Sequence, residues 1–142
     1  MRYTLKTFFL LLGLSSFSMA QMMQMAKLVA YGGGSAGDQF GNSVSISGDY
    51  KIVGVPYDDD AGNESGSAYI FVRDGTSWSQ QAKLTADDAA RDDYFGSSVS
   101  ISGDYALVGA YGDDDGGSQS GSAYTFVRDG TSWSQQAKLT AD

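Results

Sequence analysis

The chain contains neither cysteine nor histidine among its 142 residues, and it has a single proline. The absence of cysteine excludes disulfides, thiolate catalysis, thiolate metal sites and lipid attachment through an N-terminal cysteine. The absence of histidine removes the usual general base near neutral pH and the commonest metal ligand in proteins. Together the two absences exclude Ser-His and Cys-His catalysis and ordinary zinc sites.

Basic residues are also few, with nine Lys and Arg against 17 Asp and Glu. Two of the nine, Arg2 and Lys6, lie in the first 20 residues, which contain no acidic residue, so the rest carries 7 minus 17, or −10. Binding to nucleic acid or to anionic membranes relies on clustered Lys and Arg, so this balance disfavours both partners. It favours solubility and the attraction of cations.

The first 20 residues have the pattern of a secretory signal peptide. Arg2 and Lys6 precede an apolar run over residues 8–14, and Ser18-Met19-Ala20 follows it. The run is much shorter than the roughly 20 residues that span a bilayer. We therefore expect cleavage after Ala20, a secreted or cell-envelope location of bacterial type, and no membrane insertion after cleavage.

Most of the remaining chain is one unit that occurs twice. Residues 40–87 recur as residues 95–142, and 38 of the 48 aligned pairs are identical. A fixed period of this length is typical of stacked repeat architectures, in which each unit buries its apolar faces against its neighbours. The expected organisation is a signal peptide (1–20), an N-terminal segment (21–39), a first repeat (40–87), an acidic linker (88–94) and a second repeat (95–142).

Each repeat is predicted to form four antiparallel strands. The second repeat has alternating or continuous apolar stretches separated by Gly-Asp, acidic and Asp-Gly turns. The alternation of its last stretch predicts that Trp133, Gln135, Ala137 and Leu139 share one side. Four short strands in about 55 residues match one blade of a β-propeller, so we expect an all-β fold of about two blades, as an incomplete ring or as part of a longer or oligomeric propeller. The predicted strands cover residues 95–102, 105–111, 122–127 and 131–140.

The repeat resembles the FG-GAP repeat, the blade unit of the integrin α-subunit propeller. The similarity rests on Phe40-Gly41 followed by Val53-Gly54-Val55-Pro56, on Phe95-Gly96 followed by Val108-Gly109-Ala110-Tyr111, and on the later Gly66-Ser67-Ala68-Tyr69-Ile70-Phe71. The resemblance implies an extracellular, adhesion-type module that recognises a protein or a glycan without catalysis. The family's calcium loop does not carry over, because its place holds a short turn with one carboxylate, Asp49 or Asp104.

Acidic residues gather instead in the loop that follows the second strand of each repeat. We consider Asp58, Asp60, Asp113 and Asp115 as candidate Ca²⁺ ligands, because alternate aspartates can point to the same side and adjacent carboxylates repel one another without a cation. The alternative is a solvated loop without metal.

Two other functions remain open from the sequence. The first is that of a propeller glycoside hydrolase, of which this chain would be a fragment, because paired carboxylates can hydrolyse glycosidic bonds without histidine. However, the acidic residues of interest, apart from Glu64, either have a copy 55 residues away or lie in the linker. The repeat itself therefore accounts for these acidic residues, and we do not expect an enzyme. The second open function is that of a structural segment in a larger surface protein.

The chain offers two blades, whereas closed propellers use about four to eight. Residues 25–28 match residues 81–84, which predicts an isolated fourth strand ahead of the first repeat. We expect the missing blades to come either from a longer chain or from self-association.

Overall fold

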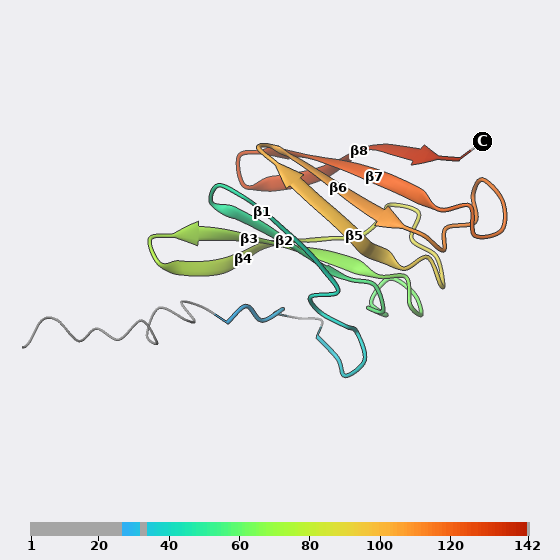
Figure 1. Cartoon of the computed structure of the whole chain (residues 1–142), viewed down its shortest axis with the longest axis horizontal. Coiled ribbons are helices and arrows are strands. Elements are labelled where there is room, and N and C mark those ends of the chain that lie inside the picture. Colours follow the sequence, from blue (N-terminus) through green and yellow to red (C-terminus); the bar gives the residue numbers. More distant parts are fainter. Residues whose placement is uncertain (1–26, 32–33, 142) are drawn as a thin grey trace, which may run out of the picture.

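The computed structural model describes residues 27–31 and 34–141. The predicted signal peptide over residues 1–20 lies outside this part, as do residues 21–26. The described residues form two separate four-stranded antiparallel sheets, which confirms the predicted all-β fold of two blades (Figure 1). No helix in these ranges is long and apolar enough to cross a membrane. Blade 1 comprises β1 (Ser43–Ser47), β2 (Tyr50–Val55), β3 (Ser67–Asp74) and β4 (Ser77–Leu84), and blade 2 comprises β5 (Phe95–Ser102), β6 (Tyr105–Ala110), β7 (Ser122–Asp129) and β8 (Ser132–Thr140).

The strands of each blade follow one another in sequence order, with short turns after the first and third strands and the longer acidic loop after the second. In blade 1, Gly48 and Gly75 adopt φ angles of 55° and 59°, which lie in the left-handed region that glycine enters without steric cost. Arg73 donates from Nε to the Asp49 carboxylate at 2.8 Å, and this bond joins β3 to the turn between β1 and β2. The predicted Gly-Asp and Asp-Gly turns therefore set the lengths of the strands.

The last strand of each blade contains a β-bulge. In blade 2 the pairing passes from Thr125 with Ala137 to Phe126 with Gln135, which leaves Gln136 without a partner in the ladder. The extra residue reverses the alternation beyond it, so Lys138 lies on the same face as Trp133 and Gln135. The prediction that Ala137 and Leu139 share that face is therefore wrong.

The main core lies between the two blades, which stack face to face (Figure 1). Serines on β1 let the innermost strands approach closely: the Ser43 hydroxyl donates to the Gly96 carbonyl at 2.7 Å, and the Ser45 hydroxyl accepts from the Ile101 amide at 3.3 Å. The buried side chains of this core are Ile52, Ala68, Ile70, Leu84 and Ala86 on one side and Phe95, Ile101, Ala106, Val108, Ala110, Tyr124 and Phe126 on the other.

The other face of blade 1 carries a smaller cluster. Val53, Val55, Tyr69 and Phe71 are buried there, and the N-terminal segment over residues 27–31 packs against them through Leu28 and Ala30. This segment is not a strand, and it is held by a bond from the Tyr31 amide to the Gln80 side chain at 2.9 Å. It lies on the side of blade 1 opposite to blade 2 (Figure 1).

Candidate functional site

The acidic loop after β2 folds around one buried carboxylate. Asp58 is only 1 % exposed, and its Oδ2 accepts hydrogen bonds from the Ser67 hydroxyl at 2.7 Å and from the Tyr69 hydroxyl at 3.2 Å. Lys83 on β4 places its ammonium 2.8 Å from the same oxygen and 2.5 Å from Asp60. The buried charge is therefore paired and hydrogen-bonded, as burial of a charge requires.

Blade 2 repeats this arrangement and adds one carboxylate. Asp113 accepts from the Ser122 hydroxyl at 2.9 Å and from the Tyr124 hydroxyl at 2.7 Å. The Lys138 ammonium lies 2.8 Å from Asp113, 2.5 Å from Asp115 and 2.7 Å from Asp88, which comes from the linker between the blades. One lysine thus joins the loop, the last strand and the linker.

These contacts shift the ionisation of the groups involved. Burial by itself would raise the pKa of Asp113, but hydrogen bonds from Lys138, Tyr124, the Asp115 amide and Ser122 outweigh it and lower the pKa to about 2. Burial opposes the charge of Lys138 too, yet its three carboxylate partners raise its pKa. Both groups are therefore charged at neutral pH.

The structure brings the candidate calcium ligands together within each blade. The carboxylates of Asp88, Asp113 and Asp115 offer oxygen atoms that lie within 4.8 Å of one another. Three carboxylates suit a cation, and the Lys138 ammonium holds the place among them that Ca²⁺ would need. Calcium binding stays a prediction, and it requires that the lysine move.

The middle aspartate of each acidic triplet has a different role. Asp59 accepts from the Glu64 amide at 2.7 Å, and Asp114 accepts from the Gln119 amide at 2.6 Å, so both fix the shape of their own loop. The lysine partners were missed by the sequence analysis because the bulge that turns Lys83 and Lys138 toward the loops is hidden in an apparent alternation.

A second cluster is aromatic and lies where the two blades meet. Tyr94, just ahead of β5, stands between Tyr57 of blade 1 and Tyr111 of blade 2. The Tyr94 and Tyr111 rings are stacked, with centroids 4.8 Å apart and an angle of 8°, and the Tyr57 ring meets Tyr94 edge to face at 5.3 Å. We call Tyr57, Tyr94 and Tyr111 the tyrosine row. Tyr111 is 54 % exposed and the other two are partly exposed, so the row is open to a ligand.

The backbone around Tyr94 holds the row in place. Tyr94 has a φ of 55°, which is unusual for a residue with a side chain, and its amide donates to the Glu64 carbonyl at 3.1 Å. Gly112 leaves room for the ring, because a Cβ at that position would lie 2.8 Å from Tyr94 Cδ2 and 2.0 Å from the Asp92 carbonyl oxygen. The repeat counterpart of Tyr94, Gln39, has a φ of 57°, so this backbone conformation belongs to the repeat, and the tyrosine ring is what distinguishes the second copy.

The surroundings of Tyr94 and Tyr111 raise the pKa of both phenols. Interaction with the Glu64 carboxylate, together with burial, raises the pKa of Tyr94 to about 12. Burial and a contact with Tyr57 raise the pKa of Tyr111. Tyr94 and Tyr111 therefore present aromatic rings and neutral hydroxyls near the Glu64 carboxylate.

The sequence analysis missed the row, although the chain contains a signal for it. Tyr57, Tyr111 and Glu64 stand at positions where the two repeats differ, and their counterparts are Gly112, Pro56 and Gln119 in that order. Tyr94, at the end of the linker, stands where the segment ahead of the first repeat has Gln39. A constellation that only one copy of a repeat carries is not needed to build the blade.

Comparison with known proteins also finds two repeated units in this chain. The family model described as FG-GAP repeat matches residues 22–71 and 78–126. A search of curated proteins finds no match to this chain. Each matched unit starts ahead of the blade, so the second one takes in β4 of blade 1 with β5, β6 and most of β7 of blade 2.

Proposed function

Because the chain belongs to the FG-GAP repeat family, we propose that it is a non-catalytic β-propeller repeat module that works outside the cell and recognises a protein or a glycan. Export is supported by the signal peptide predicted over residues 1–20. Repeats of this kind fit a β-propeller, whose loops at the ends of the blades are available for contact with other molecules.

The observation that carries the proposal is the tyrosine row. Tyrosine combines a large apolar face with a polar hydroxyl, and it is enriched among the residues that dominate binding energy. Three such rings in contact with one another, Tyr57, Tyr94 and Tyr111, form a preordered aromatic surface. Ordering before binding lowers the entropy cost of complex formation.

The buried acidic groups support binding over catalysis. A glycoside hydrolase needs two carboxylates with room for a sugar between them. In this chain Asp58 and Asp113 are both enclosed, and their oxygens bond to serine, tyrosine and lysine side chains. Their role in joining loop to sheet accounts for them without a substrate.

The test is a glycan array and a pull-down of extracellular proteins, with Tyr94→Asn as the decisive variant. Asparagine tolerates a positive φ, so the backbone near 55° is kept while the ring is lost. We expect binding of the ligand that is found to weaken by at least about fivefold, since a central interface tyrosine contributes more than about 1 kcal/mol.

Tyr31→Asn is the matched control, because Tyr31 is an exposed tyrosine away from the row. Equal weakening by both variants would contradict the proposal, and so would turnover of a sugar substrate in a hydrolase panel. If the wild-type chain binds nothing, a structural segment of a larger surface protein becomes the better interpretation.

A further inference from the structure

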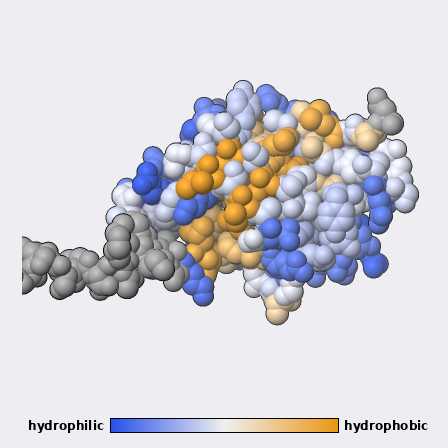
Figure 2. Space-filling model, in the orientation of Figure 1, coloured by the Kyte–Doolittle hydropathy of each residue, from blue (hydrophilic) through white to orange (hydrophobic). Residues whose placement is uncertain are grey.

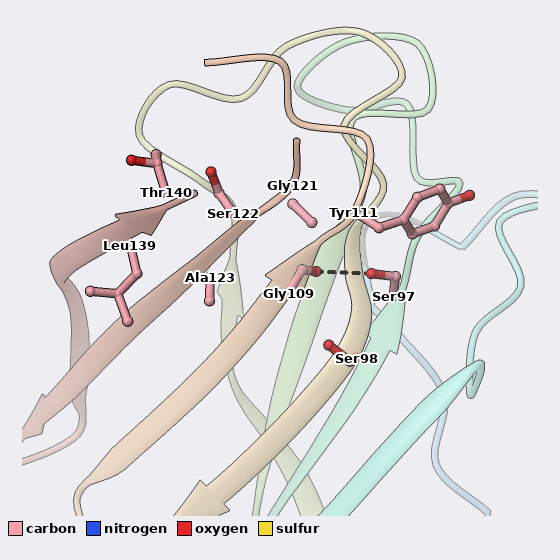
Figure 3. A pocket seen from close by; sticks show the side chains of 10 residues that line it. Ser97, Ser98, Gly109, Tyr111, Gly121, Ser122, Ala123, Leu139 and Thr140 are labelled. Carbon is pink, nitrogen blue, oxygen red and sulfur yellow. Dashed lines mark hydrogen bonds between the residues drawn. The ribbon is translucent and has the colours of Figure 1, made fainter. Parts of the chain in front are cut away.

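Blade 2 turns an open face away from blade 1, and this face contains a groove of about 450 Å³ (Figure 3). Ser98 of β5 and Leu139 of β8 stand at its two sides, with Gly109 and Ala123 between them. This order follows from the sheet, in which β6 and β7 lie between β5 and β8.

The corresponding groove on blade 1 is filled by the start of blade 2. A Cβ at Gly54 would lie 1.9 Å from the Gly96 carbonyl oxygen, and a Cβ at Gly66 would lie 2.1 Å from the Phe95 carbonyl oxygen. The Phe95 amide donates to the Ser65 carbonyl at 2.9 Å. The two glycines of blade 1 thus make room for an inserted Phe-Gly backbone.

Blade 2 has the same glycines, but none of the residues that the structure describes is inserted beside them. Gly109 and Gly121 correspond to Gly54 and Gly66. The three atoms nearest to a Cβ at Gly109 all belong to Ser98 of the same blade, and a Cβ at Gly121 would come no closer than 3.4 Å to any atom. The open groove on blade 2 is therefore built from the repeat counterparts of the residues that form the groove on blade 1, which Phe95-Gly96 fills.

We propose that this face binds blade 1 of a second copy of the chain, head to tail, with Phe40-Gly41 of that copy in the groove. Phe40-Gly41 is the counterpart of Phe95-Gly96 in the first repeat. Whereas Phe95 is fully buried in the contact between the blades, Phe40 is 36 % exposed.

Several polar and aromatic contacts between the blades recur in type on the two outer faces, whereas the tyrosine row does not, because its counterparts are not tyrosines. Within the chain, Tyr50 meets the Trp133 ring edge to face at 6.3 Å, Arg128 lies 4.6 Å above the Tyr50 ring, and the Trp133 indole donates to Gln81 at 2.9 Å. The corresponding residues on the two outer faces are identical in type: Tyr105, Trp78, Arg73 and Gln136.

Apolar side chains are exposed on both faces that would meet. Val44 and Ile46 of β1 are 68 % and 62 % exposed, and Leu107 and Leu139 of blade 2 are 44 % and 58 % exposed. In the side view of Figure 2, exposed apolar side chains form a patch over the middle of the molecule, with hydrophilic ones around it. Contact with a second copy would remove these exposed groups from water.

The N-terminal segment over residues 27–31 occupies the face of blade 1 that a second copy would contact. Leu28 and Ala30 cover on blade 1 the place that Leu84 and Ala86 cover on blade 2. Leu139 is the repeat counterpart of Leu84, so β8 of the incoming copy replaces residues 27–31, which move aside. A head-to-tail contact leaves one face open at each end, so further copies add until a ring closes, as the blades of a β-propeller do. With two blades per copy, a ring of about four to eight blades needs about two to four copies.

The experiment measures the mass of the purified chain in solution by light scattering after size-exclusion chromatography, over a range of concentrations. We expect the wild type to form a discrete oligomer. Leu139→Asp and Ile46→Asp each place a carboxylate on one of the two faces, and each variant alone is expected to stay a monomer. Mixed together, they keep one intact pair of faces and are expected to form a one-to-one dimer.

Near-ultraviolet circular dichroism serves as the folding control for both variants, which alter exposed positions. The proposal is overturned if the wild type stays a monomer at every concentration, which would leave the open groove to a following blade of a longer chain. It is also overturned if only one of the two variants impairs association, because the contact would then join two copies of the same face. Failure of the mixture to form dimers would equally reject the head-to-tail arrangement.

Discussion

At the scale of the residue, the informative feature is a buried carboxylate that each blade encloses in its acidic loop. Asp58 and Asp113 are nearly inaccessible, and each one is paired with a lysine from the last strand of its blade. Burying an ion costs free energy that its partners offset only when the geometry is good. Serine and tyrosine hydroxyls complete that geometry in both blades.

The lowered pKa of Asp113 predicts a dependence of stability on pH. The pKa is about 2 in the folded chain against an ordinary value of 3.8, so the contribution is complete above the ordinary value and is lost as the pH falls toward about 2. Asp113→Asn removes this contribution, and its free energy of unfolding should change less over that interval than that of the wild type. Urea denaturation at a series of acidic pH values measures the difference.

Asp129→Asn is the control, because Asp129 is an exposed residue at the end of β7 for which asparagine is equally suited to the following turn. It should keep the wild-type dependence on pH. At neutral pH, Asp113→Asn is expected to lose about 1–3 kcal/mol, the usual cost of a buried group that loses its partner. A wild-type pH profile in Asp113→Asn would show that the buried carboxylate does not contribute as described.

Calcium binding can be tested by removing the ammonium that stands in its place. In Lys138→Met, the carboxylates of Asp88, Asp113 and Asp115 lose their shared cation, so Ca²⁺ at about millimolar concentration should raise the melting temperature of this variant more than that of the wild type. Lys83→Met is the control, since Asp58 and Asp60 are the only carboxylates paired with Lys83 among the described residues. If calcium shifts neither variant, the four predicted aspartates do not hold the ion.

At the scale of the element, a Phe-Gly pair stabilises the fold more when it lies between two blades than when it lies on an outer face. Phe95 is fully buried and packs edge to face on Tyr124 and Phe126, whereas Phe40 makes the equivalent contacts with Tyr69 and Phe71 on an outer face. The same motif is thus buried in one repeat and partly exposed in the other.

This difference predicts unequal costs for the same substitution. Phe95→Ala should lower the free energy of unfolding by about 3–5 kcal/mol, the range for a buried phenylalanine. Phe40→Ala should cost only about 1 kcal/mol at concentrations where the chain is a single copy, because its ring is already partly in water. Urea denaturation compares the two, and equal costs would argue against the insertion of Phe95 between the blades.

The strands and turns could be predicted because their signals are local. The alternation in β5 and the Gly-Asp and Asp-Gly turns follow from steric preferences of neighbouring residues, and the observed strands lie within a few residues of the predicted ones. The bulge at Gln136 could not be predicted in this way, because it depends on how β8 pairs with β7. That bulge in turn decides which face carries Lys138.

At the scale of the whole molecule, the two stacked blades in residues 34–141 leave the outer face of each one without a neighbouring blade from that part of the chain. The N-terminal segment partly covers blade 1 through Leu28 and Ala30, and blade 2 keeps an open groove. The second unit matched by the family model runs from β4 across the contact between the blades into β7. It therefore includes that contact together with strands from both blades.

The sequence by itself determined the repeat, the strands, the family and the acidic loops, because each of these depends on residue type and spacing along the chain. Only the tertiary structure decided that lysines neutralise the buried aspartates, that three tyrosines from different segments form one row, and that one groove is filled while its copy is open. These features depend on contacts between residues far apart in sequence, such as Lys138 with Asp88 and Tyr57 with Tyr94. The packing of the two blades brings such residues together, and this packing cannot be read from the spacing of residues along the chain.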